Sequence, residues 1–129
     1  MNFELNKSLK FLINLEELAL FIGSAILFGL ASSYSWWIFP LLFFVPDISF
    51  VAYLINTKIG SWIYNLLHHK GLMIFLAFIG YFVQIEWLLT VGIVFLGHTA
   101  FDRMFGYGLK FPDDFKHTHL GWIGNRIAR

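Results

Sequence analysis

Four side chains within the apolar parts of this 129-residue sequence have the types that bind divalent metal ions. His98 and Asp102 are four residues apart, so a helix places them on one face. His68 lies in an earlier apolar segment, and Asp47 follows Pro46 in the segment before that. Neutral imidazole and carboxylate form a common ligand set for zinc, manganese or iron. We therefore predict a site for one divalent metal ion, with these four side chains as its ligands.

The same side chains also fit a plainer interpretation. His98 and Asp102 could form only a hydrogen-bonded pair, and Asp102 could instead pair with Arg103 or Lys70. Which interpretation holds depends on the elements that position these residues.

Composition restricts those elements. The chain is 58% hydrophobic and 13% charged, whereas ordinary soluble domains are about 45–50% apolar and about 25% charged. A chain of this length has too little interior to bury so much apolar surface. The net charge of +1 and the absence of cysteine argue against a nucleic-acid partner, a disulfide scaffold and thiolate chemistry. The sequence therefore predicts an integral membrane protein.

A membrane-spanning helix needs about 20 mostly apolar residues. Four segments qualify, at about 11–30, 36–55, 59–83 and 87–105, and short polar breaks separate them. Such short connections make successive helices antiparallel neighbours. We expect an all-α membrane protein, with residues 1–129 forming one domain. Its four-helix transmembrane bundle is followed by a tail, 106–129, at the membrane interface, and the third span is expected to bend at Lys70-Gly71.

The distribution of Lys and Arg sets the expected orientation. Lysines precede the first span and separate the second from the third, and Lys and Arg follow the fourth, whereas 31–35 and 84–86 contain none. Both termini are therefore expected on the cytoplasmic side. Every span then places an ionisable group roughly 5–14 Å from its cytoplasmic end, at 1.5 Å per residue. This agreement predicts one shared polar cavity that opens to the cytoplasm. The groups are Glu16, Asp47, His68, His98 and Asp102.

Several motifs resemble a known family, the bacterial domain-of-unknown-function family 4260. The motifs are Pro46-Asp47-Ile48-Ser49, Tyr64-Asn65-Leu66-Leu67-His68, Gly97-His98-Thr99-Ala100-Phe101-Asp102-Arg103, Gly106-Tyr107-Gly108-Leu109-Lys110-Phe111 and Thr118-His119-Leu120-Gly121. The resemblance covers nearly the whole chain and implies a small multi-pass protein of the bacterial inner membrane.

A more distant resemblance is to the membrane-bound metal-dependent hydrolases. Asp47 matches the first Asp of that family's Pro-Asp-x-Asp element, and His98 with Asp102 matches its His-x-x-x-Asp element. His68 matches its middle histidine, whereas Ser49 stands in place of its second Asp. This resemblance implies hydrolysis of an amphipathic or lipid-like ester or phosphoester at the cytoplasmic leaflet.

Candidates for a catalytic role, or for replacing a missing ligand, are Glu16, Arg103, Lys110 and His119. Arg103 and Lys110 have the charge to hold an anionic headgroup. Two other functions remain open. One is a small proton- or cation-coupled transporter, which would need a homo-oligomer because four short helices leave little room for alternating access. The other is a haem-binding or purely structural membrane protein.

Overall fold

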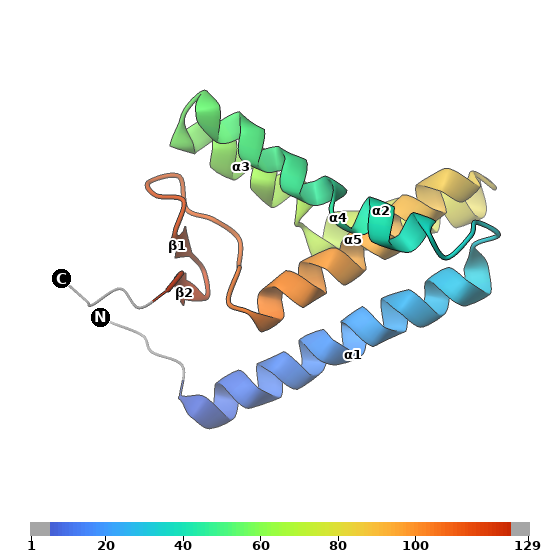
Figure 1. Cartoon of the computed structure of the whole chain (residues 1–129), viewed down its shortest axis with the longest axis horizontal. Helices are drawn as coiled ribbons and strands as arrows, with labels where there is room; N and C mark the ends of the chain where they lie inside the picture. The colour runs from blue at the N-terminus through green and yellow to red at the C-terminus, as the bar shows by residue number, and fades with distance from the viewer. Residues whose placement is uncertain (1–5, 125–129) are drawn as a thin grey trace.

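The computed structural model describes residues 6–124 and is mostly helical (Figure 1). The elements, in chain order, are α1 (Lys7–Ala31), α2 (Ile38–Phe43), the 3-10 helix η1 (Val45–Leu54), α3 (Thr57–Leu67), α4 (Lys70–Phe82), α5 (Glu86–Met104), β1 (His117–Thr118) and β2 (Gly121–Trp122).

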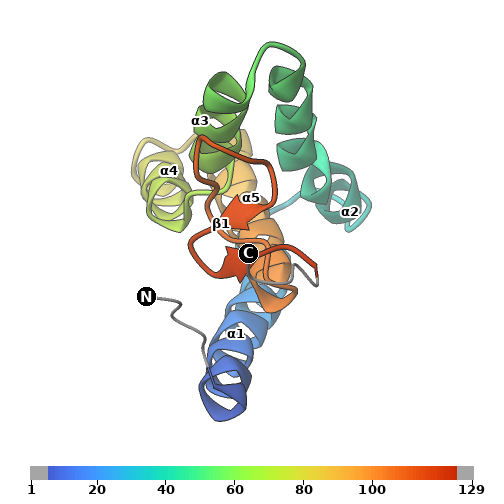
Figure 2. The same cartoon turned by 90° about the vertical axis from the view of Figure 1, so that its left-hand side faces the viewer.

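α5 lies at the centre and packs against α1, α2 and α4 (Figure 2). Nearly all of its middle turns are buried, from Thr90 to Ala100. Small residues allow the close approach of α4, because a Cβ at Gly92 would lie 2.6 Å from the backbone nitrogen of Ala77. The apolar core joins α5 to α1 and α2 through Phe28, Phe43, Ile93 and Val94.

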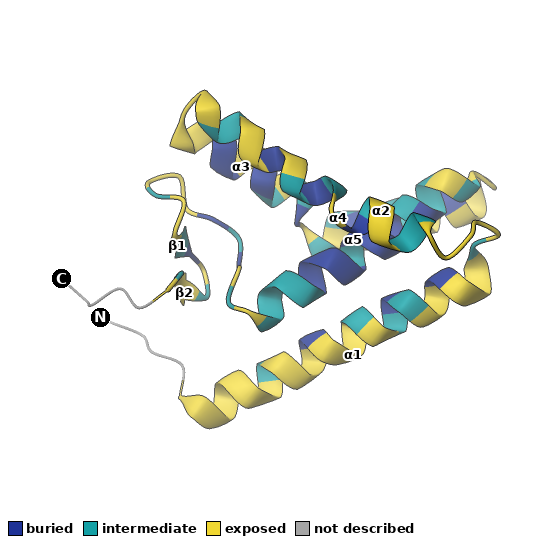
Figure 3. Cartoon of the chain, in the orientation of Figure 1, coloured by how far each residue is buried: buried dark blue, intermediate teal, exposed yellow. Residues whose placement is uncertain are grey.

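α1 buries one stripe and exposes the rest of its surface (Figure 3). Its buried residues, Glu17, Ser24 and Phe28, are spaced seven and four apart, which places them on one helical face. This face meets α5, where the Ser24 hydroxyl donates a hydrogen bond to the Ile93 carbonyl at 2.9 Å. Exposed apolar side chains cover the remaining surface, among them Phe11, Leu12, Leu15, Leu18, Ile22, Ile26, Leu27 and Leu30.

Two of the predicted spans are interrupted. The segment predicted as one helix over 36–55 divides into α2 and η1, with Pro46 in the first turn of η1. Proline has no N–H to donate and disfavours α-helix in the residue before it. The segment 59–83 divides between His68, which ends α3, and His69, whose Nδ1 accepts a hydrogen bond from the Leu72 backbone at the start of α4. α3 and α4 are inclined by 45°. The bend predicted at Lys70-Gly71 is therefore present, and it lies slightly earlier in the chain, at His68 and His69.

The described helices do not confirm a four-helix transmembrane bundle. Among them, α1 by itself is long and apolar enough to cross a membrane, and α3 with α4 qualifies if the bent pair counts as one span. The 3-10 break divides the second predicted span. α5 contains the polar residues His98, Asp102 and Arg103 and is not among the helices that meet the requirement for a span.

The tail folds back along α3 as irregular chain with a small hairpin. β1 and β2 pair antiparallel, with His117 opposite Trp122, and a further bridge joins Lys110 to Thr118. Phe115 contacts the Tyr53 ring of η1 with centroids 5.1 Å apart. The tail therefore lies at the end of the molecule where η1 meets α3.

Candidate metal centre

The four side chains predicted as metal ligands come from three elements and meet at one place. Asp47 lies in the first turn of η1, and His68 is the residue at which α3 ends. His98 and Asp102 lie one turn apart on α5. One ligand atom from each residue lies within 4.8 Å of all the others. The structure thus brings together side chains that are far apart in the sequence.

The breaks in the helices help to form this cluster. Pro46 lies in the first turn of η1, and the next residue, Asp47, contacts His98 of α5. His68 leaves helical geometry, with φ of −111° and ψ of 21°. A continuous helix through either position would have placed these side chains by helical periodicity alone.

The distances are those expected of ligands around one small cation. The Nε2 atom of His98 lies 3.1 Å from Nε2 of His68. It lies 3.1 Å from Oδ2 of Asp102 and 3.2 Å from Oδ1 of Asp47. The same Asp atoms lie 3.4 Å and 3.7 Å from Nε2 of His68. Tetrahedral ligands with zinc bond lengths of about 2.0–2.2 Å would lie about 3.3–3.6 Å apart, and these five separations are close to that range.

Contacts within α3 fix the orientation of His68. Its Nδ1 lies 2.8 Å from the Tyr64 carbonyl, and the Tyr64 ring stacks on the imidazole with centroids 3.8 Å apart. A carbonyl only accepts hydrogen bonds, so Nδ1 carries the proton and Nε2 presents its lone pair to the cluster. This is the arrangement of a histidine held ready to bind a metal.

His98 is held mainly by packing. Its ring meets the edge of Phe43 with centroids 4.9 Å apart, and the residue is 1% exposed. Among the described residues its buried Nδ1 has no hydrogen-bond partner. By contrast, the Asp47 side chain is 35% exposed, so the cluster is open on the η1 side.

Neither alternative partner of Asp102 is found within the described chain. Arg103 donates from Nη2 to the His68 carbonyl at 3.1 Å and makes no ion pair with Asp102. Lys70 pairs with the buried Glu17 on α1. The predicted alternatives that joined Asp102 to Arg103 or Lys70 were therefore wrong, because both cations are engaged elsewhere. The pair between His98 and Asp102 is present, as part of the larger cluster.

Lys110 is enclosed by aromatic rings, which we call the Lys110 box. Its Nζ donates to the Phe115 carbonyl at 2.9 Å and lies 3.2 Å from the Phe115 ring centroid and 4.5 Å from that of Tyr64. Phe50 and Tyr53 lie within 5.9 Å. Burial lowers the pKa of Lys110 to about 8, and the ring faces stabilise its charged form. Within residues 6–124, no hydrogen bond or ion pair joins Lys110 to the four clustered side chains.

Asn65 attaches the tail to α3 beside the cluster. Its Nδ2 donates to the Lys110 carbonyl at 2.8 Å, and its Oδ1 accepts from the Lys110 backbone at 2.6 Å. The sequence motifs contained both residues but did not show that they pair. An amide in an apolar segment, three residues before His68, was the signal that marked Asn65.

The remaining catalytic candidates lie outside the four-residue cluster. Glu16 is exposed on α1. His119 accepts a hydrogen bond at Nδ1 from the Leu109 backbone at 2.8 Å. Partial burial lowers the pKa of His119, which favours the neutral ring that this bond requires. His119 thus has a structural role in the tail.

The fold and the cluster define a mostly helical protein with a candidate metal site, and comparison with known proteins adds the family. The chain belongs to the family described as Domain of unknown function (DUF4260), whose model matches residues 10–123. The comparisons with curated proteins and with solved structures gave no match. The family match confirms the family named in the first resemblance, and it tests neither the bacterial origin nor the membrane location that the resemblance implied. It does not test the second, to metal-dependent hydrolases.

Proposed function

We propose that Asp47, His68, His98 and Asp102 bind one divalent metal ion, and that this ion serves a membrane hydrolase. The convergence of two imidazole Nε2 atoms and two carboxylates carries this proposal. Without a cation, acceptor atoms of this kind repel one another in an interior of low dielectric constant. A proton relieves part of this repulsion, whereas a divalent ion satisfies all of the donor atoms together.

The arrangement of the chain supports a membrane location with four passes. Ser33, in the connection after α1, bonds to Glu86 at the start of α5, so the two connections without Lys or Arg meet at one end. Lys10 and Trp122 line one cavity at the other end. The broken helices agree with this location, because irregular backbone at membrane depth is tolerated where it lines a polar site. We place the Lys-bearing end at the cytoplasmic face of a bacterial inner membrane.

The proposed reaction is hydrolysis of an ester or phosphoester of an amphipathic molecule. Water adds to the carbonyl carbon or phosphorus, the bond to the leaving oxygen breaks, and the proton from water passes to the leaving group. A bound divalent ion would lower the pKa of water and polarise the scissile group. Tyr64 orients His68, Phe43 packs against His98, and the exposed side of Asp47 leaves the cluster open for entry.

Elemental analysis tests the metal site directly. The full chain is purified from the membrane fraction in detergent, and zinc, manganese and iron are measured per chain. We expect about one ion per folded chain, because four ligands define one site. Substitution His98→Ala should remove it. Asp102→Asn, which keeps the side-chain shape, provides a second variant in case His98→Ala does not fold.

A matched control lies in the tail. His117 and Asp113 are also four residues apart, but their pair is exposed and joins no cluster of described residues. His117→Ala should therefore retain the ion. Folded protein that stays metal-free after incubation with each ion would overturn the site, and recovery of the chain in the soluble fraction would overturn the membrane location.

Hydrolysis has its own test. Short-chain nitrophenyl esters and bis-nitrophenyl phosphate report ester and phosphodiester cleavage. Activity should disappear on chelation and in Asp102→Asn, and remain in His117→Ala. Metal-loaded protein that cleaves neither class would refute the hydrolase assignment while leaving the metal site.

The geometry favours a single small metal ion over a haem. The two Nε2 atoms are 3.1 Å apart, which is less than twice a metal–nitrogen bond of about 2.0 Å. They therefore do not suit the opposite axial positions of a haem iron. A proton-coupled transporter remains the second candidate, because the contact between His68 and His98 also suits proton transfer. Metal-free protein that carries protons in liposomes would favour it.

A further inference from the structure

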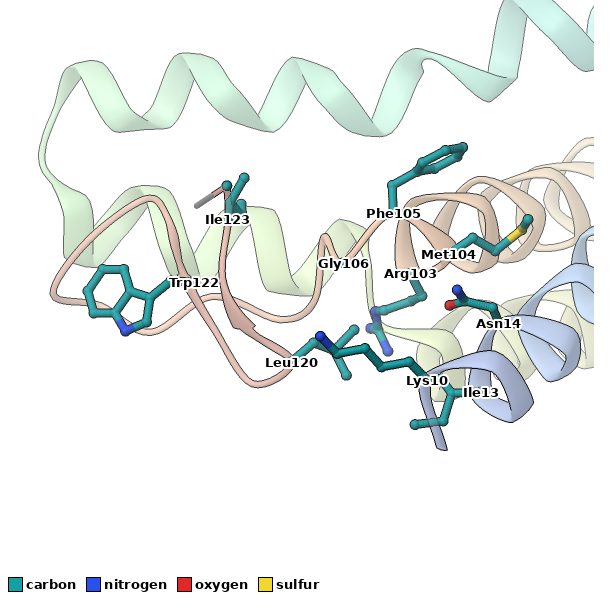
Figure 4. Close-up of a pocket in the computed structure, with 11 residues that line it drawn as sticks. Lys10, Ile13, Asn14, Arg103, Met104, Phe105, Gly106, Leu120, Trp122 and Ile123 are labelled. Atoms are coloured by element: carbon teal, nitrogen blue, oxygen red, sulfur yellow. The ribbon is translucent and has the colours of Figure 1, made fainter. Parts of the chain in front are cut away.

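A second polar site lies at the cytoplasmic end, outside the metal cluster. It is a cavity of about 320 Å³ between the start of α1, the end of α5 and the tail (Figure 4). Three segments that are distant in sequence form its walls. Lys10, Arg103, Asn14 and Leu120 lie near one another in this view.

The polar part of this cavity is cationic. Lys10 from α1 and Arg103 from α5 both line it, and Asn14 adds an amide one turn beyond Lys10. Among the described lining residues there is no Asp or Glu. Within residues 6–124, Lys10 Nζ makes no ion pair and the Asn14 side chain makes no hydrogen bond. The cavity thus contains unused donors, and none of its described lining residues is acidic.

Arg103 has unused donor capacity of its own. Its Nη2 holds the His68 carbonyl, but its Nε is buried and has no partner among the described residues. A guanidinium presents five N–H donors and pairs well with phosphate or carboxylate. Glu17 on α1 supplies a negative charge that acts on Arg103, but it does not line the cavity and its Oε1 is bonded to Lys70.

The other walls are apolar and suit a hydrocarbon chain. Ile13 lies beside Lys10, and Leu120 from the tail lies close to the Lys10 side chain. Met104 and Phe105 add apolar surface from the end of α5. An anionic head beside such walls is the pattern of an amphiphile, not of a fully hydrated ion.

We propose that this cavity binds the phosphate or carboxylate head of an anionic amphiphile through Lys10, Arg103 and Asn14. The inference rests on the proposed function and names the class of its substrate. Arg103 touches both sites, because it follows Asp102 in α5 and holds the His68 carbonyl. A head bound by Arg103 would be placed beside the metal cluster, with its apolar part toward the membrane.

Binding is measured by calorimetry on the full chain in a non-ionic detergent. The probes are dihexanoyl phosphatidic acid, dihexanoyl phosphatidylcholine and inorganic phosphate. We expect saturable binding of the anionic lipid at one site per chain and weaker binding of the zwitterionic lipid. Inorganic phosphate should also bind less tightly, because it does not use the apolar walls. Lys10→Glu should weaken binding of the anionic lipid at least about tenfold, the usual effect of losing a charge-assisted hydrogen bond.

Lys58→Glu is the matched control, since Lys58 is an exposed lysine in the first turn of α3 and does not line the cavity. It carries the same change of charge and should bind as the unaltered chain does. Equal affinity in Lys10→Glu and the unaltered chain, equal loss in both variants, or absence of binding would overturn the inference. Phosphate binding as tightly as the lipid would show that a free anion is the ligand.

Metal content measured on the same samples separates this inference from the proposed function. Binding that depends on Lys10 in a metal-free protein would support the cavity and refute the metal centre. If the protein contains the metal and hydrolyses esters, but its affinity for the lipid is the same in Lys10→Glu, only the proposed role of the cavity is refuted.

Discussion

The metal cluster and the Lys110 box are both buried and polar, and both use Tyr64, yet they are built differently. In the box, the ammonium has a carbonyl acceptor in Phe115 and aromatic faces around it. In the cluster, Nε2 atoms and carboxylate oxygens point at one another. The ammonium in the box has its acceptor within the chain, whereas the two carboxylates of the cluster contact two imidazoles and no described Lys or Arg.

This difference distinguishes a buried charge that stabilises the fold from a group of side chains that can bind a ligand. A buried charge whose partners are supplied by the same chain stabilises the fold and needs nothing from outside. A group of converging acceptors is stabilised by an added proton or by a bound cation. Side-chain type alone does not distinguish the two cases, since Lys110 and His98 are both buried ionisable residues.

Removing the metal should produce the largest effect. A chelator should lower the free energy of unfolding by about 4 kcal/mol when the ion has been present at 1,000 times its dissociation constant. Tryptophan fluorescence in detergent follows the melting temperature. Asp102→Asn should melt at one temperature with or without chelator. If the unaltered chain is equally insensitive to chelator, the cluster is a network that is stable without an ion, as the Lys110 box is.

Breaking the contact between the tail and α3 should have a smaller effect. Asn65→Leu removes two hydrogen bonds to the Lys110 backbone and should cost about 2 kcal/mol, because it leaves the partner groups unsatisfied. Limited proteolysis should cut the tail faster than in the unaltered chain. Gln84→Leu, which changes an exposed amide in the connection between α4 and α5, is the control and should leave the cleavage rate of the tail unchanged. Equal cleavage in Asn65→Leu would show that the hairpin and ring contacts hold the tail without Asn65.

Removing the charge of the Lys110 box should have the smallest effect. Lys110→Met loses the contacts with the rings but also removes a buried charge, so the free energy of unfolding should change by about 1 kcal/mol or less. Metal content and the response to chelator should stay as in the unaltered chain. Loss of the ion in this variant would show that the two regions act as one site.

The same variant makes a prediction about pH. The pKa of Lys110 is about 8 in the folded protein and 10.5 ordinarily, so between these values the unfolded chain binds more protons. Stability therefore gains a favourable contribution as the pH rises from 8 to 10.5. Melting curves over this range should show a weaker rise for Lys110→Met, and identical pH profiles would contradict the burial of a charged Lys110.

The sequence predicted the residues of the candidate site better than the elements that hold them. Because His98 and Asp102 are four residues apart, a helix places them on one face. Asp47 and His68 stood out because they are ionisable residues within apolar segments. The unbroken span over 36–55 was wrong, because a hydropathy pattern does not register how Pro46 redirects the backbone. The bend predicted in 59–83 is present, and it lies at His68 and His69 instead of Lys70-Gly71. Whether four passes cross a membrane stays a prediction.

By itself, the sequence determined the family, the abundance of apolar surface and the chemical types of the four candidate ligands. Only the tertiary structure decided that these four converge, that Lys110 and Lys70 are occupied elsewhere, and that Lys10 and Arg103 share a cavity. The physical reason is that helical periodicity relates residues within one element. Distances between elements depend on how the helices break and pack, which no local pattern specifies.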